Sequence, residues 1–171
     1  TNYLLRMTVR PQYLDERSWR GLLHQHTEGA ADALAAGSVS GYCGFDPTAD
    51  SLHVGSLVPI MGLVHLQRCG HRPIALVGGG TGMIGDPSGR SAERQLADAA
   101  VVDANAEAIH RQLERFLDFS GPAAATMRNN AEWLGPLGAV AFLRDVGKHF
   151  SVNVMLAKDS VKSRLDDGIS F

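Results

Sequence analysis

Cysteine is scarce in this sequence, because only Cys43 and Cys69 occur among its 171 residues. Two cysteines at this spacing indicate neither a disulfide framework nor a metal site, and their rarity is typical of a reducing cytoplasm. An excess of one charge is missing as well. The formal net charge of −2 does not indicate a nucleic-acid surface, so an RNA partner would dock mainly on other parts of the protein. No apolar run is long enough to cross a membrane, and we expect no membrane contact.

Apolar residues are plentiful by contrast. They make up 44% of the chain, which supports a packed core and argues against a disordered tail. The length suits one ordinary domain. The chain begins at Thr1 and ends on the apolar Phe171 just after a turn at Gly168. We therefore expect a fragment, with a helical lead-in over residues 1–37 and part of a larger domain over residues 38–171.

The first half of the sequence divides into elements by the periodicity of its apolar residues. A run of turn-forming residues, Asp46-Pro47-Thr48, cannot continue a strand, and Gly70 is a good residue to end a helix. The prediction is a helix over 15–26, a small and flexible segment over 30–37, a strand over 39–45, a helix over 57–69 and a strand over 73–77. Strand, helix and strand over this length form one right-handed βαβ unit with parallel strands.

The second half is mostly helical in pattern. It predicts helices over 105–119, 137–146 and 152–165, and a short strand over 124–127. The fold class is therefore α/β: a Rossmann-like open parallel sheet with helices on both faces, incomplete within these residues. Ligands in such sheets bind beyond the carboxyl ends of the strands, where the loops after residues 45 and 77 lie.

One motif invites a different interpretation. The run from Gly80 to Gly85 matches GxGxxG and follows a predicted strand, as in dinucleotide-binding dehydrogenases. That fingerprint needs its third glycine inside the opening helix, whereas a turn, Asp86-Pro87-Ser88-Gly89, follows here at once. Asp103, at the distance of a ribose-binding acid, falls in or beside a helix. A P-loop is also excluded, because no Gly-Lys-Ser/Thr occurs.

The stronger pattern is the first strand with the turn after it. Gly44 and Gly55 allow a flat ring and a ribose to approach the backbone closely. His53 stands just before a helix N-terminus, where amide groups and the helix dipole favour an anionic phosphate. A lone histidine is more often structural, but this position beside two glycines favours contact with phosphate.

These residues carry a resemblance to a known family. The run Asp46-Pro47-Thr48-Ala49-Asp50-Ser51-Leu52-His53-Val54-Gly55-Ser56 resembles the HIGH signature of class I aminoacyl-tRNA synthetases, and Tyr42-Cys43-Gly44-Phe45 before it resembles the tyrosyl form. Further stretches agree in the same order: 70–73, 82–89, 115–119, Asn129-Asn130 with Trp133, and 142–153. The sequence from about Trp19 to Phe171 is thus similar to tyrosyl-tRNA synthetases of the bacterial and organellar type.

The resemblance implies a reaction and its partners. Such enzymes join L-tyrosine to ATP, with Mg²⁺ accompanying the nucleotide, and then pass the tyrosyl group to tRNA(Tyr). It also implies a substrate pocket in which Tyr42 bonds the tyrosine phenol and Asp86 and Thr81 hold its ammonium group. Asn130 is expected to belong to the same pocket, and Trp133 to its wall. A buried partner for the phenol would reject phenylalanine strongly.

The nucleotide side is implied in the same way. Cys43, Gly44, Asp46, Gly55 and Ser56 are expected to line the ATP site. Ser56 stands where the last histidine of the signature usually falls, and its shorter hydroxyl weakens the expected contact with ATP.

The catalytic set implied by the family is His53, Ser56 and Thr48 together with Arg90 and Arg94. His53 also belongs to the ATP site. The two arginines would present cations to departing pyrophosphate, although solvated charges at a helix start are the plainer interpretation. Arg90 replaces a common lysine, which preserves the charge and changes the geometry.

Parts of the family pattern are not found in these residues: a later tyrosine and glutamine of the pocket, the KMSKS-like loop and the anticodon-binding region. We therefore expect the chain alone to activate tyrosine poorly or not at all, and the full-length parent to be a cytoplasmic homodimer. Three alternatives stay open: a tryptophanyl-type synthetase, a non-catalytic synthetase-derived regulator or RNA-splicing partner, and an α/β nucleotide-binding domain of unassigned substrate.

Overall fold

The computed structural model of the chain describes residues 12–83, 98–162 and 165. Its centre is a three-stranded parallel sheet in the order β1-β2-β3. The strands are β1 (Ser40–Phe45), β2 (Arg72–Val77) and β3 (Thr126–Asn129). Counted from β3, the strand order is 3-2-1, which is the first half of the strand order of doubly wound α/β sheets. The predicted open parallel sheet of Rossmann type is confirmed.

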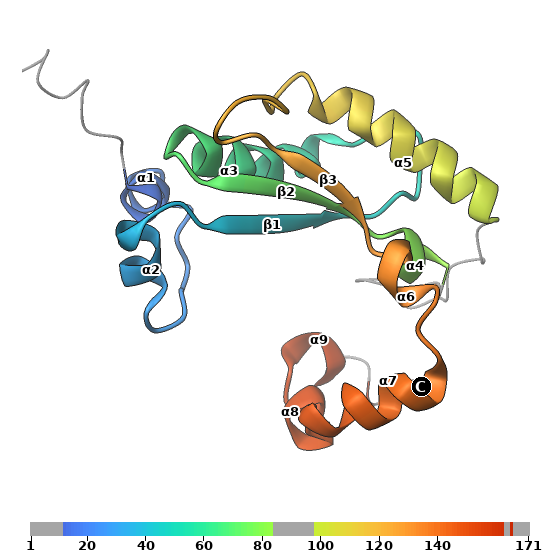
Figure 1. The fold of residues 1–171 in the computed structure, drawn as a ribbon. Helices are drawn as coiled ribbons and strands as arrows, with labels where there is room; N and C mark the ends of the chain where they lie inside the picture. The colour runs from blue at the N-terminus through green and yellow to red at the C-terminus, as the bar shows by residue number, and fades with distance from the viewer. Residues whose placement is uncertain (1–11, 84–97, 163–164, 166–171) are drawn as a thin grey trace, which may run out of the picture.

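Helices lie beside this sheet and at its ends (Figure 1). The long ones are α3 (Leu57–Arg68), which connects β1 to β2, and α5 (Ala99–Leu113), which precedes β3. The shorter helices and turns are α1 (Tyr13–Trp19), α2 (Ala30–Ala36), η2 (Val54–Ser56), α4 (Gly79–Gly82), α6 (Ala131–Leu134), α7 (Ala139–Asp145), η3 (Gly147–His149), α8 (Val152–Leu156) and α9 (Asp159–Lys162). No helix among the described residues combines the length and the apolar character needed to cross a membrane.

The core lies between one face of the sheet and the pair α3 and α5. Ala75 of β2 and Ile109 and Leu113 of α5 are fully buried there. Helix α3 contributes Ile60 and Leu63 to the same cluster. Because α3 is buried on several sides, its apolar residues run nearly all the way round it, as the sequence predicts. This core fixes the strand ends from which the site is built.

The opposite face of β1 is open. Side chains alternate along a strand, so Tyr42 and Gly44 point away from the core that Phe45 enters. Tyr42 is 72% exposed. Strand β1 is also an edge strand, because β2 is its only strand partner among the described residues.

The N-terminal helices differ from the prediction. The helix expected over 15–26 is α1, which ends at Trp19 because Gly21 adopts a left-handed φ of 67°. The Gly21 N–H then donates to the Ser18 carbonyl and the Leu22 N–H to the Arg17 carbonyl, the pattern of a glycine-terminated helix. The segment expected to be flexible over 30–37 is helix α2, since a run rich in alanine favours a helix.

Later boundaries shift as well. The helix expected over 105–119 begins six residues earlier, because Asp98 caps it by accepting the Ala100 N–H at 3.0 Å. It ends at Leu113, so that Phe116 and Leu117 lie in the following turn. The expected strand over 124–127 is β3, two residues later. The single helix expected over 152–165 is two short helices, α8 and α9.

Candidate active site

The carboxyl ends of the three strands lie level with one another. Phe45, Val77 and Asn129 are aligned across the sheet, and each is the last residue of its strand. The Gly78 N–H donates to the Phe45 carbonyl at 3.0 Å and the Asn130 N–H to the Val77 carbonyl at 3.0 Å, which continues the pairing one step past the strands. The loops predicted to bind ligand therefore meet at one edge, where α4 and α6 also lie (Figure 1).

Asn130 joins two of these loops. It is 8% exposed, and its Oδ1 accepts the Gly80 N–H at 2.7 Å while its Nδ2 donates to Thr81 Oγ1 at 3.1 Å. The Thr81 hydroxyl in turn donates to the Gly78 carbonyl at 3.2 Å. Both ends of the Asn130 amide are thus occupied by the glycine-rich turn. Asn130 holds that turn in place, and Thr81 is the half-buried polar group presented above it.

The glycines of this turn leave room for the asparagines. A Cβ added to Gly79 would lie 2.3 Å from Asn129 Oδ1, and one added to Gly80 would lie 3.2 Å from Asn130 Oδ1. Asp46, the first residue after β1, is close as well, since a Cβ on Gly78 would lie 3.2 Å from its Oδ1. The structure therefore brings Asp46, Thr81 and Asn130 together around Gly78.

His53 caps the start of η2. Its Nδ1 accepts the Gly55 N–H at 3.1 Å. In the neutral imidazole this bond places the proton on Nε2, which leaves an N–H donor on the exposed side of the ring. Gly55 is needed here, because a Cβ at that position would lie 2.8 Å from His53 Cε1. His53 thus presents an exposed N–H donor at the N-terminal end of a helix, a position that favours an anion.

The remaining predicted residues are less closely grouped. Thr48 and Ser56 lie on the same turn as His53, Thr48 exposed and Ser56 half-buried. Tyr42 and Gly44 share the open face of β1, whereas Cys43 points the other way and packs against the core cluster. Burial raises the pKa of the Cys43 thiol, so it stays protonated and able to donate.

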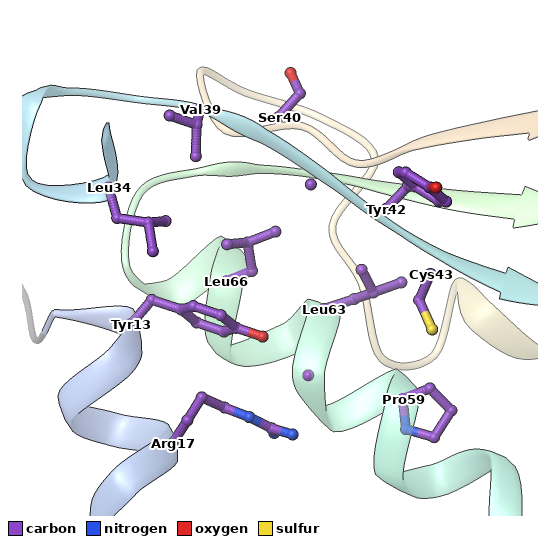
Figure 2. Close-up of a pocket in the computed structure, with 12 residues that line it drawn as sticks. Tyr13, Arg17, Leu34, Val39, Ser40, Tyr42, Cys43, Pro59, Leu63 and Leu66 are labelled. Carbon is purple, nitrogen blue, oxygen red and sulfur yellow. The ribbon is translucent and has the colours of Figure 1, made fainter. Parts of the chain in front are cut away.

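A cavity of about 410 Å³ lies beside the amino-terminal half of β1. Figure 2 shows Tyr42 and Cys43 on its rim, with Tyr13 and Arg17 of α1 and Leu66 of α3 around it. The residues at the carboxyl ends of the strands do not line it. The cavity is therefore separate from the strand ends, and the predicted site residues that line it are Tyr42 and Cys43 of β1.

Three predicted residues, Asp86, Arg90 and Arg94, lie outside the described residues. Among those described, no cluster of three or more histidine, cysteine, aspartate or glutamate side chains is suitably placed to hold a metal ion.

Two residues that support the site were not expected from the sequence. Asn105 and Gln112 of α5 donate to or accept from the backbone of the loop after β1. No motif marks them, because their partners are far away in the sequence.

A sheet of this order, with a histidine-capped helix after its first strand and a glycine-rich turn after its second, defines a nucleotide-binding α/β domain. Comparison with known proteins specifies which kind. The family model "tRNA synthetases class I (W and Y)" matches residues 35–171. The chain belongs to this family.

Individual relatives agree with the family match. The chain is 59% identical over 152 residues to "Tyrosine--tRNA ligase" of Anaeromyxobacter dehalogenans, covering 89% of this chain and 36% of the relative. It is 58% identical over 161 residues to "Tyrosine--tRNA ligase" of Roseiflexus castenholzii, covering 92% and 38%. A C-terminally truncated mitochondrial tyrosyl-tRNA synthetase of Aspergillus nidulans has a TM-score of 0.80 at 29% identity, covering 98% of this chain and 51% of that one. The chain thus spans less than two fifths of the length of these curated relatives.

Proposed function

We propose that the whole protein to which this chain belongs is a tyrosine–tRNA ligase. It activates L-tyrosine with ATP and transfers the tyrosyl group to tRNA(Tyr). The names of the relatives support this assignment over a tryptophan enzyme. The observation that carries it is the tyrosine at position 42, exposed on β1 two residues before Gly44 and close in sequence to the His53 turn.

The chemistry has two steps. A carboxylate oxygen of tyrosine attacks the α-phosphorus of ATP, the bond from that phosphorus to the bridging oxygen breaks, and pyrophosphate leaves. A hydroxyl of the terminal ribose of the tRNA then attacks the tyrosyl carbonyl, and AMP leaves. The nucleophile comes from the substrate in both steps. The protein therefore contributes positioning and stabilisation of charge.

The described residues suit these tasks. The Nε2–H of His53 and the hydroxyl of Thr48 donate to phosphate oxygens. Gly44 admits the ribose on the open face of β1, and Cys43 lines the nucleotide side as its neighbour in the strand. Tyr42 bonds the phenol of the substrate, and Thr81, held by Asn130, assists its ammonium group.

The remaining roles in the site are proposed from the sequence resemblance. Asp46, Gly55 and Ser56 complete the nucleotide side, Asp86 accepts from the ammonium group, and Arg90 and Arg94 neutralise pyrophosphate. Mg²⁺ arrives with ATP as part of the substrate complex.

Tyrosine-dependent exchange of labelled pyrophosphate into ATP by the whole protein tests the assignment. We expect exchange with tyrosine and none above background with tryptophan or phenylalanine. Tyr42→Phe should raise the KM for tyrosine and weaken the discrimination against phenylalanine. Preference for tryptophan, or discrimination unchanged in Tyr42→Phe, would refute this function or this role for Tyr42. The 171-residue chain alone should exchange far more slowly than the whole protein.

The proposed assembly is a homodimer in the cytoplasm. Support comes from apolar side chains of the C-terminal helical region that are more than half exposed, namely Val140, Leu143, Phe150, Val152 and Val154. Both cysteines are free thiols, as suits a reducing compartment. Light scattering of the whole protein should give the mass of a dimer, and Val140→Asp with Leu143→Asp should give a monomer. A monomeric parent protein would overturn this assembly.

A further inference from the structure

The loop that carries Thr48 and His53 has no secondary structure of its own. Residues 46–53 are neither helix nor strand. Such a loop keeps one shape only where its backbone N–H and C=O groups find partners elsewhere. Those partners are side chains of α5, which lie 58 to 62 residues further along the chain.

Gln112 is the main partner. Its Oε1 accepts the Leu52 N–H at 3.0 Å, and its Nε2 donates to the Asp50 carbonyl at 2.9 Å. A single side-chain amide thus pairs with a donor and an acceptor of the loop, as a neighbouring peptide group would. Seven residues earlier, about two helical turns away on the same face, Asn105 Nδ2 donates to the Pro47 carbonyl at 3.0 Å.

These bonds lie beside the two residues that we propose to contact phosphate. Leu52 immediately precedes His53, and its side chain packs against the core cluster, so that both its side chain and its N–H are fixed. Pro47 immediately precedes Thr48. The two amides of α5 therefore hold the chain next to each of these phosphate-facing residues.

We propose that Gln112, assisted by Asn105, is a positioning residue for the activation of tyrosine by ATP. This rests on the function proposed above. Gln112 touches no reacting atom. It acts through the loop, by fixing where Thr48 and His53 stand relative to the start of α3, and the phosphate groups of ATP are the part of the substrate that depends on it.

Gln67 of α3 provides a matched control. Its Oε1 accepts the Asp118 N–H at 3.0 Å, and its Nε2 donates to the carbonyls of Asp118 at 2.6 Å and Ala123 at 2.8 Å. It therefore clamps a loop with its amide as Gln112 does, but that loop joins α5 to β3 and carries none of the proposed site residues. A purely structural role would make the two glutamines equivalent.

The test compares Gln112→Leu and Gln67→Leu in the whole protein by tyrosine-dependent pyrophosphate exchange. For Gln112→Leu we expect kcat/KM for ATP to fall by about tenfold or more, because a backbone N–H loses its partner and the loop loosens. The KM for tyrosine should stay within about twofold, since Tyr42 lies on β1. Gln67→Leu should lower the melting temperature comparably and leave both constants within about twofold. Gln112→Glu, which keeps the acceptor for Leu52, should fall between Gln112→Leu and the parent.

Hydrogen exchange gives a readout that does not need activity. Amide protons of residues 48–56 should exchange faster in Gln112→Leu and at the parent rate in Gln67→Leu. Where Gln112→Leu does not fold, Asn105→Ala replaces it, with the same signs and smaller effects. Unchanged exchange rates in this segment, or equal losses of kcat/KM for ATP in the two leucine variants, would overturn the proposal. A parent protein without tyrosine-dependent exchange would refute the proposed function, and the hydrogen-exchange comparison would still decide whether Gln112 fixes the loop.

Discussion

Two glycines of β1 separate the contribution of this strand to folding from its contribution to binding. Gly41 faces α3, and a Cβ added there would lie 2.7 Å from Leu66 Cδ2. Gly44 faces outward, and a Cβ added there would meet nothing within 4 Å. Neither glycine has a positive φ. Alanine is therefore compatible with the backbone at both positions, and only the surroundings of the new methyl group differ.

The expected changes in unfolding free energy have opposite signs. Gly44→Ala should stabilise the fold by about 0.5–1 kcal/mol, because alanine loses less backbone entropy than glycine on folding. Gly41→Ala should destabilise it by about 1 kcal/mol, because the buried Leu66 side chain must leave its preferred rotamer and turn toward the adjoining cavity to make room for the methyl group. Urea unfolding of the 171-residue chain measures both values.

The expected changes in ATP binding are reversed. A methyl group on Gly44 would occupy the surface where we propose that the ribose approaches, which should weaken binding by about 1–3 kcal/mol, or roughly five- to 150-fold in KM for ATP. Gly41→Ala should leave that KM nearly unchanged, because its methyl group points into the protein. The KM values come from pyrophosphate exchange by the whole protein. A Gly44→Ala variant that loses stability, or that keeps its KM for ATP, would refute the reasoning about the open face.

Other features give predictions of the same kind. Asn130→Ala should lower the free energy of unfolding, measured with urea, by about 1–3 kcal/mol, because the Gly80 N–H loses its buried acceptor. Asn130→Asp keeps an acceptor there and should lower it less. Burial lowers the pKa of His71, whose Nδ1 accepts the Val39 N–H, so the folded chain takes up this proton at lower pH than the unfolded chain. The stability that neutral His71 contributes to the fold is therefore complete above about pH 6.5 and declines below it. The urea concentration at the unfolding midpoint should be lower at pH 5.5 than at pH 7.5, and the difference should be smaller in His71→Gln. Burial raises the pKa of Cys43, so an aromatic disulfide reagent at pH 7.5 should label this thiol more slowly than free cysteine, and more slowly still with ATP bound; labelling that matches free cysteine would contradict its environment.

The unit from β1 to β2 could be predicted because its signals are local. The strand at residues 39–45 stops at a turn sequence, and the helix after it stops at Gly70. Each signal needs only its neighbours in the chain. The same local signals place His53 before a helix, and the structure shows its ring accepting from the N–H two residues further on.

Long-range features could not be predicted in this way. In the sequence Gln112 looks like any polar residue on the outer face of an amphipathic helix, and only the fold reveals that the loop after β1 lies against it. The sequence places Asn130 in the expected tyrosine pocket, but it does not show that this side chain binds the glycine-rich turn. That hydrogen bond to Gly80 forms because β3, which leads to Asn130, lies next to β2, which leads to the turn. At the N-terminus, the pattern through Leu22 looked helical beyond the point where the conformation of Gly21 ends the helix.

The free edge of β1 has a consequence for engineering. Among the described residues the strand pairs on one side only, and an unpaired edge is a template for another strand. Because Tyr42 and Gly44 lie on this strand, a second polypeptide that added its strand there would complete a wall of the proposed binding site in the same step. This edge offers a place to design one half of a split-protein reporter, in which recovery of the proposed tyrosine binding would signal that the two halves have met. An unpaired edge also favours pairing between identical copies, so such a reporter would be used at low concentration.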